Sequence, residues 1–571
     1  MNTRRVSAND VTLAVYEWGD PDSPTVVLIH GYPDTAAVWD LVADRLQGRY
    51  HVVAYDVRGA GASTPGRDGY QLDRLLADLV AVIDATSGGR PVHLVGHDWG
   101  SIQGWEAATS EDIAGRVASF TSMSGPSLDH VGWWVRRRRR PSPRALRQLA
   151  GQTSRSWYMY LFHLPVLPEL VWRAGARVWP AALRRIEGIP PAEGHPAPTL
   201  ADDAVRGLEL YRDNIRQRTL HPRKAYARVP VQLIVATRDR YASPALFEDL
   251  DEWVPDLWRR SIPAGHWGTL RRHPDVIARW IGEFVDHVEG GDETRGLRRA
   301  RSGVARGDFD GHLVLVTGAG SGIGAATADA FAKQGAEVVA VDIDGEAAAR
   351  TAERVGGHAY QVDVSDAAAM ERLAKDVERD HGVPDIVVNN AGIGVAGSFL
   401  DTDLADWERV IDVNLWGVIH GSRLFARQLV ERGEGGHIVN IASAAAYLPS
   451  RALPAYATTK AAVLMLTECL RAELTGRGIG VTAICPGFVN TNITRTTRFA
   501  GLSDAEQERE RERAARRYQR RNYAPERVAA QILRAVRRDR AVVPVTVEAR
   551  VGYALSRLSP GTLRALARVA R

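Results

Sequence analysis

Short apolar runs and longer helical patterns alternate along this chain. The apolar runs are rich in valine, leucine and isoleucine, which is typical of buried strands. In the first half they are 25–29, 51–55, 92–95 and 231–236, and in the second half 313–316, 337–341, 386–388 and 437–441. Such alternation predicts two parallel sheets covered by helices, the α/β class.

Two stretches interrupt the alternation. Residues 126–227 are rich in Trp, Tyr, Arg and Pro with a mainly helical pattern, so we expect a cap over one end of the first sheet. Residues 289–309 are polar and aperiodic, which is typical of a linker. Because 13 of the 15 tryptophans precede it, a fusion is favoured over a duplication. The predicted domains are 1–288 and 310–538, with a tail, 539–571.

Length and composition agree with this division. A chain of 571 residues is too long for one core. No apolar run reaches the roughly 18 to 20 residues that span a bilayer. The start of the chain has no signal-peptide pattern, so we expect a cytoplasmic protein. Two cysteines, Cys469 and Cys485, exclude a disulfide framework.

Basic charge is concentrated in one place. The net charge is +5, but Trp133 and Trp134 shortly precede five consecutive arginines, 136–140. A solvated charged loop explains such a run. Attachment to anionic lipid is the alternative, so peripheral membrane contact stays open. No nucleic-acid motif accompanies the run, and we expect no nucleic-acid partner.

The first candidate site is the segment Gly96-His97-Asp98-Trp99-Gly100, between an apolar run and a helical pattern. Its glycines permit the sharp strand-to-helix turn that presents the middle residue, Asp98, at the top of a sheet. A carboxylate there can attack carbon and form an ester. A helix N-cap is the structural alternative.

Three further segments favour catalysis. The segment 30–33, His-Gly-Tyr-Pro, follows an apolar run and can turn backbone N–H groups toward an oxyanion. Asp239 follows the run 231–236 and His266 comes later, giving the order nucleophile, acid, histidine. We therefore predict that His266 is the base and that Asp239 orients it.

These segments resemble the α/β-hydrolase superfamily, specifically its epoxide hydrolase branch, over about residues 11–288. The resemblance implies hydrolysis of an epoxide to a vicinal diol without a cofactor, and the aromatic cap favours a small apolar or lipid-derived substrate. It also implies two cap tyrosines that hydrogen-bond the epoxide oxygen. They match Tyr158 and Tyr211, with Tyr160 as a competitor for the first.

The resemblance places the oxyanion contacts on the backbone N–H groups of Tyr32 and Trp99. Two alternatives stay open. A haloalkane dehalogenase shares the Asp98-Trp99 pair, although Tyr32 stands where those enzymes often have a halide-binding asparagine. In the other alternative, this half is an inactive lipid-binding module and only the second half is an enzyme.

The second half contains a nucleotide-binding pattern. The apolar run 313–316 is followed by the glycine-rich segment 317–324 and a helical pattern. Glycines let the backbone approach a pyrophosphate, and a helix N-terminus adds partial positive charge. Asp342 ends the next run, where its carboxylate would bond ribose hydroxyls and repel a 2′-phosphate. The sequence therefore predicts NAD rather than NADP, with an N-cap role as the alternative for Asp342.

A tyrosine and a lysine form the second candidate catalytic pair. Tyr456 and Lys460 are four residues apart, so one helical face can carry both. A nearby ammonium lowers the pKa of a phenol, which suits Tyr456 to exchange a proton with an alcohol or carbonyl. Ser443 ends an apolar run and can bond the same substrate oxygen.

With Asn389-Asn390-Ala391-Gly392, Asp412-Val413-Asn414 and Pro486-Gly487, this half resembles the short-chain dehydrogenase/reductase family over about 309–538. The resemblance implies a Rossmann fold, self-association through this half and no metal. The catalytic residues that it implies are Asn414, Ser443, Tyr456 and Lys460. The cofactor contacts that it implies are Gly318, Ser321, Ile323, Asp342, Asp363, Val364, Asn390, Tyr456 and Lys460.

The order of the halves resembles bifunctional proteins of mycobacteria and related actinobacteria. It suggests a reaction sequence in which an epoxide becomes a diol and the diol becomes a hydroxyketone. The only motivation in the sequence is that one site would make an alcohol and the other would oxidise alcohols.

Overall fold

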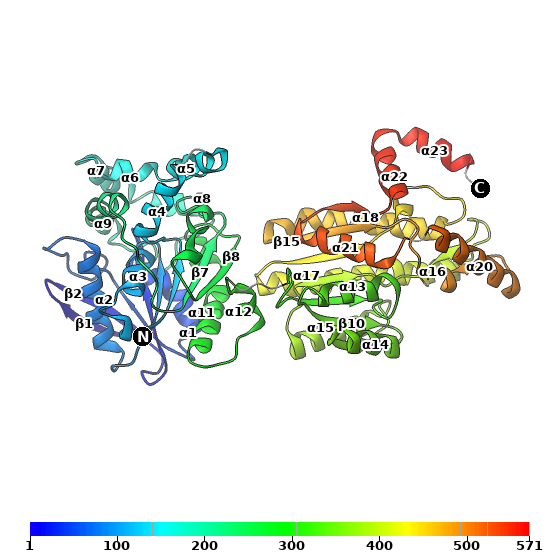
Figure 1. Cartoon of the computed structure of the whole chain (residues 1–571). Coiled ribbons are helices and arrows are strands. Elements are labelled where there is room, and N and C mark those ends of the chain that lie inside the picture. Colours follow the sequence, from blue (N-terminus) through cyan, green and yellow to red (C-terminus); the bar gives the residue numbers. More distant parts are fainter. Residues whose placement is uncertain (140–141, 304–306, 492, 522, 570–571) are drawn as a thin grey trace. The chain divides into compact units, whose positions relative to one another are not determined.

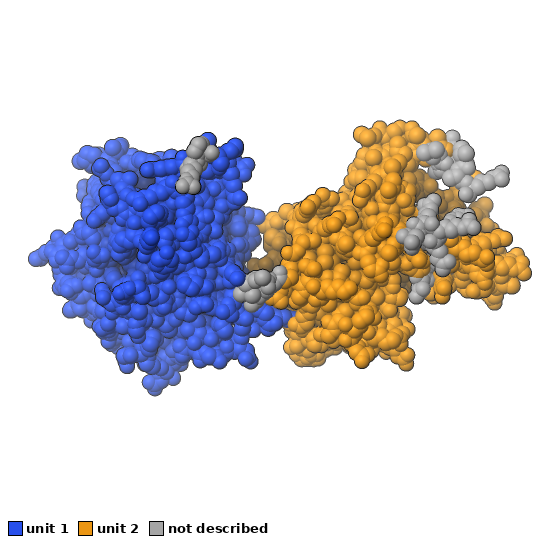
Figure 2. Space-filling view, viewed as in Figure 1, with its two compact units in different colours: residues 1–304 blue, residues 305–571 orange. Residues whose placement is uncertain are grey.

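The chain forms two compact units, Met1–Val304 and Ala305–Arg571, which Figure 2 colours separately. The computed structural model describes residues 1–139, 142–303, 307–491, 493–521 and 523–569, without the side chains of 494, 517–521 and 566–569. Within these residues, no helix is long and apolar enough to cross a membrane.

The first unit is built on an eight-stranded sheet in the order β1-β2-β4-β3-β5-β6-β7-β8 (Figure 1). β2 runs antiparallel to both of its neighbours, whereas β4 to β8 are parallel along the sheet. The strands are β1 (Asn2–Ala8), β2 (Val11–Trp18), β3 (Thr25–Ile29), β4 (His51–Tyr55), β5 (Val92–His97), β6 (Val117–Met123), β7 (Val231–Ala236) and β8 (Leu257–Ile262).

Helices cover both faces of this sheet. Val27 and Ile29 of β3 pack in one core cluster with residues of α2 and α3, and Val26 and Leu28 pack in another with residues of α1 and α11. A strand buried on both faces is apolar at every position, which is why these strands read as continuous apolar runs. The helices are α1 (Asp40–Leu46), α2 (Leu72–Thr86), α3 (Trp99–Thr109), α10 (Gly268–Arg272) and α11 (Pro274–Val288).

In the part of the cap that the structure describes, six helices lie between β6 and β7. In Figure 1 they cover one end of the first sheet. They are α4 (Leu128–Arg138), α5 (Pro143–Arg155), α6 (Trp157–Phe162), α7 (Leu167–Gly175), α8 (Trp179–Glu187) and α9 (Leu200–Leu220). The predicted fold class, an α/β hydrolase with a helical cap, is confirmed for this unit.

The predicted linker, 289–309, differs in the structure. Residues Arg295–Ala300 form helix α12, which Thr294 caps by accepting a hydrogen bond from the backbone N–H of Leu297 at 3.1 Å. Leu297 is fully buried and packs with Trp258 of β8 and Phe284 of α11. The first unit therefore extends beyond the predicted end at 288. The sequence does not predict this helix because one apolar side chain among arginines is a weak signal.

The second unit has a seven-stranded parallel sheet in the order β11-β10-β9-β12-β14-β15-β17, a Rossmann arrangement as predicted. Its strands are β9 (Leu313–Thr317), β10 (Glu337–Asp342), β11 (His358–Gln361), β12 (Ile386–Asn389), β14 (Gly436–Ile441), β15 (Ile479–Cys485) and β17 (Val542–Pro544). The main helices are α13 (Gly322–Ala332), α14 (Gly345–Val355), α15 (Ala367–His381), α17 (Gly417–Arg432), α18 (Pro454–Leu474), α20 (Asp504–Arg521) and α21 (Pro525–Arg537).

The predicted domain end at 538 is too early. β17 pairs with β15 at the edge of the sheet, and Ala549 of α22 (Val547–Leu558) is fully buried. The Tyr447 hydroxyl donates to the Ala549 carbonyl at 2.8 Å, which ties α22 to the unit. A strand of three residues is too short to show periodicity. The segment predicted as a tail therefore completes the second sheet.

Candidate functional sites

Asp98 occupies the turn between β5 and α3. Its φ of 52° lies in the left-handed region, which side chains other than glycine rarely adopt. The packing around it is close: a methyl group on Gly31 would lie 2.4 Å from Asp98 Cβ, and one on Gly125 would lie 2.0 Å from the Asp98 carbonyl oxygen. Strain held in this way is typical of a nucleophile turn rather than of an N-cap.

The predicted acid and histidine lie in the loops that follow two other strands and come close to Asp98. Asp239 follows β7, and its Oδ2 lies 2.9 Å from Nδ1 of His266, which follows β8. The other ring nitrogen, Nε2, lies 3.8 Å from Asp98 Oδ1. Asp239 also accepts backbone N–H bonds from Tyr241 and Ala242 at 2.7 and 3.1 Å, which fix its orientation.

Burial and charge act against each other in this triad. Burial raises the pKa of Asp98, although His266 and two backbone N–H groups partly oppose it. For Asp239, the same penalty of burial is outweighed by His266, so its pKa is lowered. Burial disfavours the imidazolium of His266, but the carboxylates of Asp239 and Asp98 raise its pKa to about 9. His266 therefore carries a proton at neutral pH in the resting site.

The two predicted oxyanion donors hydrogen-bond the carboxylate of the nucleophile, Asp98. The backbone N–H of Tyr32 donates to Asp98 Oδ2 at 2.8 Å, and the backbone N–H of Trp99 bonds the same carboxylate. An oxyanion formed on an ester of Asp98 would come from one of these carboxylate oxygens. The two N–H groups are thus oriented for a charge that develops during ester hydrolysis.

Two of the three candidate cap tyrosines lie together near Asp98 and Trp99. The rings of Tyr158 (α6) and Tyr211 (α9) lie 6.0 Å apart, and Tyr211 lies 5.0 Å from the Trp99 ring. Tyr160 is 69% exposed and points away from the site. Burial raises the pKa of Tyr158 and Tyr211 well above 10, so both stay neutral and can donate hydrogen bonds.

Sequence reasoning missed Tyr241. Its ring centroid lies 5.4 Å from that of Tyr158 and 5.0 Å from that of His266, and burial raises its pKa to about 12. It follows Asp239 by two residues, so the only available signal was its closeness to a predicted site residue. We place Tyr241 in the wall between the cap tyrosines and the base.

The glycine-rich loop joins β9 to α13 in the second unit. A methyl group on Gly324 would lie 2.0 Å from the Gly318 carbonyl oxygen, so the loop packs closely against the start of α13, as the glycines of dinucleotide-binding loops do. Asn390 holds the loop: its Nδ2 donates to the carbonyls of Thr317 and Gly318 at 2.9 and 3.1 Å. Asn390 therefore shapes the predicted cofactor site through its side chain.

Other predicted cofactor residues surround this loop. Asp342 ends β10, and its Oδ2 accepts the backbone N–H of Gly320 at 2.8 Å. Ser321 is the N-cap residue of α13, and Ile323 lies in its first turn. Asp363 bonds Ser365, and Val364 is 7% exposed beside it. All lie at the carboxyl edge of the sheet, where α/β proteins of this topology bind nucleotides.

The four predicted catalytic residues lie near one another. Asn414 sits in a π-turn, Asp412–Trp416, and bonds the backbone of Ile393 through both side-chain atoms, at 2.8 and 3.0 Å. π-turns inside helices are frequent at functional sites. A methyl group on Gly392 would lie 3.1 Å from Asn414 Oδ1 and 3.5 Å from Lys460 Nζ. The amide and the ammonium thus approach the same glycine.

Tyr456 and Lys460 lie on one face of α18. Lys460 Nζ is 5.8 Å from the centre of the Tyr456 ring and donates to the Ile441 carbonyl at 2.9 Å. Burial lowers the pKa of Lys460 to about 8. Ser443 follows β14, and its hydroxyl accepts the backbone N–H of Ala445 at 3.2 Å. The arrangement places a phenol, a hydroxyl and an ammonium at one edge of the sheet.

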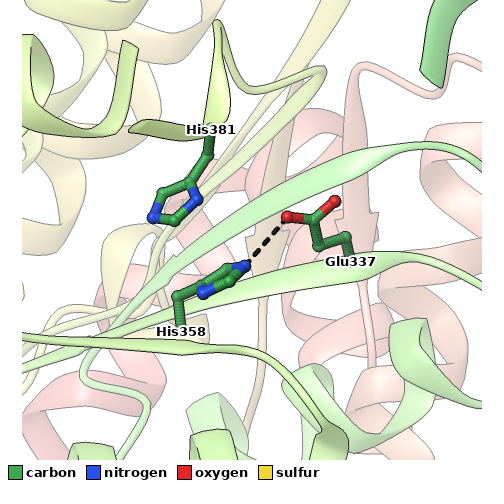
Figure 3. A group of neighbouring side chains, drawn as sticks. All are labelled: Glu337, His358 and His381. Atoms are coloured by element: carbon green, nitrogen blue, oxygen red, sulfur yellow. Dashed lines mark hydrogen bonds and ion pairs between the residues drawn. The ribbon is translucent and has the colours of Figure 1, made fainter. Parts of the chain in front are cut away.

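One group of side chains in the second unit has residue types that could hold a metal (Figure 3). Glu337 begins β10, His358 begins β11 and His381 ends α15, so the group lies at the amino edge of the sheet, away from the glycine-rich loop. Glu337 lies 2.9 Å from His358 Nε2, and Tyr360 lies 3.0 Å from His381 Nε2. The imidazoles stack at 3.9 Å, so hydrogen bonding and stacking account for the group.

Comparison with known proteins agrees with the folds of both units. The family model for short chain dehydrogenases matches residues 312–500, and the model for the alpha/beta hydrolase fold matches residues 24–162. The protein therefore joins an α/β hydrolase to a short-chain dehydrogenase/reductase. It is 45% identical over 580 residues to "Probable oxidoreductase EphD" of Mycobacterium tuberculosis, covering 99% of this chain and 98% of that protein. The chain belongs to the EphD family.

Other relatives match about a third of the chain. D-threitol dehydrogenase of Mycolicibacterium smegmatis is 38% identical over 190 residues, covering 32% of this chain and 73% of that protein. Meso-2,3-butanediol dehydrogenase of Serratia marcescens is 36% identical over 189 residues, covering 33% and 74%. A crystal structure of a short-chain dehydrogenase/reductase from Burkholderia phymatum with NAD is 31% identical, with a TM-score of 0.41, covering 45% of this chain and 96% of that one.

Proposed function

We propose that the first unit hydrolyses epoxides to vicinal diols through an ester of Asp98. The observation that carries this proposal is a strained carboxylate that lies 3.8 Å from a histidine base and interacts electrostatically with two buried, neutral tyrosines. A haloalkane dehalogenase needs halide donors at the leaving group, whereas an epoxide needs acids that protonate an alkoxide. Two buried phenols with raised pKa values favour the epoxide.

The proposed reaction has two steps. In the first, Asp98 attacks a ring carbon, the carbon–oxygen bond breaks, and Tyr158 or Tyr211 protonates the alkoxide. In the second, His266 takes a proton from water, and the resulting hydroxide attacks the ester carbonyl. The N–H groups of Tyr32 and Trp99 stabilise the tetrahedral oxyanion. When it collapses, the departing alkoxide takes the proton from His266 and the diol leaves. The proton of the regenerated Asp98 carboxyl group returns to the tyrosinate, which restores the resting site.

Heavy-oxygen water tests this reaction directly. Over repeated turnovers in H₂¹⁸O, hydroxide that attacks the ester carbonyl leaves its oxygen in the Asp98 carboxylate, which mass spectrometry of the peptide detects. Label in the diol alone, with none in Asp98, would mean that water attacks the epoxide directly. An inactive lipid-binding module would produce neither labelled diol nor labelled peptide.

Tyr158 and Tyr211, and not Tyr160, are expected to carry ring opening. Each single change to phenylalanine should lower kcat/KM for epoxides by about 10- to 100-fold, and the double change by at least about 10³-fold, because one general acid is worth 10²–10⁴-fold. Tyr160→Phe is the matched control on the same helix and should leave the rate unchanged. A larger loss in Tyr160→Phe than in Tyr158→Phe would reverse the assignment.

The second step should have a characteristic pH dependence. His266 must be neutral to accept a proton, so ester hydrolysis speeds up as pH rises through its pKa. That pKa is about 9 in the resting site, where two carboxylates support the imidazolium. Esterified Asp98 has no charge, so we expect an apparent pKa below about 9. Stopped-flow decay of the ester between pH 6 and 9.5 measures it, and a rate that falls with pH contradicts this role of His266.

We propose that the second unit oxidises alcohols, or reduces carbonyls, with NAD. The compact loop around Gly318 and Gly324 and the carboxylate of Asp342 would hold the dinucleotide, which supplies the site that gains or loses hydride. Tyr456 would exchange the hydroxyl proton of the substrate, and Ser443 would hydrogen-bond the same oxygen. Lys460 would favour the tyrosinate through its charge.

Asp342 is expected to decide the choice of cofactor. Its carboxylate would lie beside the 2′-phosphate of NADP, and like charges in contact cost several kcal/mol. We expect kcat/KM to favour NAD by at least about 100-fold, and Asp342→Ser to reduce that preference below about tenfold. Steady-state rates with each cofactor measure both ratios. Asp344→Ser is the control, because Asp344 caps α14 by accepting from Ala347 N–H. A wild-type preference for NADP contradicts the prediction.

The two activities are proposed to act in sequence on one substrate. Meso-2,3-butanediol dehydrogenase and D-threitol dehydrogenase, by their names, act on vicinal diols, the product class proposed for the first unit. One epoxide supplied with NAD should therefore give a hydroxyketone and one NADH per diol consumed. Diol that accumulates without NADH contradicts the sequence for that substrate.

A further inference from the structure

The cap of the first unit has an unusual concentration of exposed apolar side chains. The described residues of the first unit include thirteen exposed large apolar side chains. Ten of them lie between Leu146 and Ile186, on or beside α5 to α8. They include Trp157 and Tyr160, which are 64% and 69% exposed. Patches of this kind on a soluble protein mark a binding surface.

On helix α7 the exposed apolar side chains share one face of the helix. Its Pro168 and Trp172 are buried, and α7 packs on α9. Leu167, Leu170, Val171 and Ala174 are exposed, at spacing i, i+3, i+4 and i+7. An apolar stripe at this spacing normally faces a core, whereas here it faces outward. Helix α6, which contacts α7, adds Trp157 and Tyr160.

Most of the charge on these helices is positive. Between Pro143 and Glu187 there are seven arginines, two glutamates, and no lysine or aspartate. Glu169 is paired with Arg212 at 2.8 Å, and Glu187 is 7% exposed. The exposed charge of α5 to α8 is therefore positive. A surface that combines aromatic and aliphatic side chains with arginines is complementary to an anionic lipid surface.

Part of the basic run that suggested membrane contact makes contacts within the first unit. Trp134 is 2% exposed, and Arg138 bonds Asp249 at 2.6 Å. Arg136 lies over the Trp133 ring, whose Nε1 donates to the Arg223 carbonyl. Residue 140 lies outside the described residues. These side chains stabilise the junction of α4 with the unit, whereas the larger exposed apolar surface with arginines lies on α5 to α8.

We propose that the exposed face of α6 and α7 is a docking surface for anionic lipid bilayers. Helix α6 has two roles in this arrangement. Trp157 and Tyr160 lie on its outer face, and Tyr158 points inward to Tyr211 and Tyr241. Docking therefore brings the bilayer within one helix diameter of the cap tyrosines. A lipid-borne epoxide would then approach the site from the membrane, a consequence that rests on the proposed hydrolase function.

Vesicle co-sedimentation of the full-length protein tests the docking surface without any substrate. We expect binding to vesicles of phosphatidylcholine with phosphatidylglycerol, and weaker binding to phosphatidylcholine alone or at high salt. Leu170→Glu with Val171→Glu should lower the partition coefficient at least about tenfold. Arg173→Ala and Arg177→Ala should each lower it about fivefold on anionic vesicles only.

The matched control is Leu400→Glu with Leu404→Glu, two leucines of the second unit that are 90% and 80% exposed. It should bind vesicles like the wild type. The proposal is overturned if the wild type does not bind anionic vesicles at low salt, or if the control loses binding equally. It is also overturned if the cap variant changes oligomeric state in solution without losing vesicle binding, since a second copy then covers this face.

Activity separates the docking surface from the proposed reaction. With a long-chain epoxide carried in vesicles, the cap variant should lose turnover in proportion to its loss of binding. With a short water-soluble epoxide, its turnover should equal that of the wild type. Vesicle binding without hydrolysis of either epoxide would leave the docking surface standing and contradict only the hydrolase function.

Discussion

Replacement of Asp98 by alanine is expected to lower epoxide hydrolysis by at least about 10⁴-fold in kcat/KM, because removal of a nucleophile eliminates both steps of the reaction. Neither His266 nor the N–H groups of Tyr32 and Trp99 can substitute for it, since each acts on the ester that Asp98 forms. The same preparation should oxidise alcohols with NAD at the wild-type rate. Parallel assays of both reactions on one sample measure the two effects.

A second variant shows whether the loss comes from nucleophilic catalysis. His266→Gln removes the base but keeps Asp98, so ring opening should proceed once and stop at the ester. Mass spectrometry should then find the peptide that contains Asp98 heavier by one substrate. If Asp98→Ala retains more than a few per cent of the activity, the carboxylate is not the nucleophile.

Tyr456→Phe is expected to lower kcat of the second unit by at least about 10³-fold, while epoxide hydrolysis is unchanged. Phenylalanine keeps the ring but removes the only group of the proposed set that exchanges a proton with the substrate, a contribution worth 10²–10⁴-fold. Cofactor affinity should change little, because the glycine-rich loop and Asp342 are untouched. Initial rates at saturating NAD and a fluorescence titration of cofactor separate the two quantities.

The control for this variant is Tyr360→Phe. Tyr360 lies on β11, and its hydroxyl is 3.0 Å from His381 Nε2 at the amino edge of the sheet. Its removal should leave both activities unchanged. Equal losses of kcat in the two variants would point to destabilisation of the second unit, and an unchanged rate in Tyr456→Phe would contradict the proton-exchange role.

Some features of the fold were predictable because they are local. A strand buried on both faces has to be apolar at every position, so β3 and β9 are visible as runs in the sequence. The turn at Asp98 and the loop at Gly318 need glycines for close backbone packing, and these glycines stand at recognisable spacing. The family models match the same segments.

Other features could not be predicted because their sequence signals are too short. Helix α12 is anchored by one leucine, and β17 has three residues. The sequence predicts a linker and a tail at these places because neither a single buried side chain nor a strand of three residues shows periodicity. Their places in the two units depend on partners far away in the chain, Phe284 for α12 and β15 for β17.

By itself, the sequence determined the fold class, the two units and the residue types that could carry each reaction. Only the tertiary structure decided which side chains meet. It turned Tyr158 inward and Tyr160 outward, added Tyr241 beside His266, and left the apolar stripe of α7 facing outward. The physical reason is that periodicity tells which residues share a face of a helix, whereas the packing of distant elements determines what that face contacts.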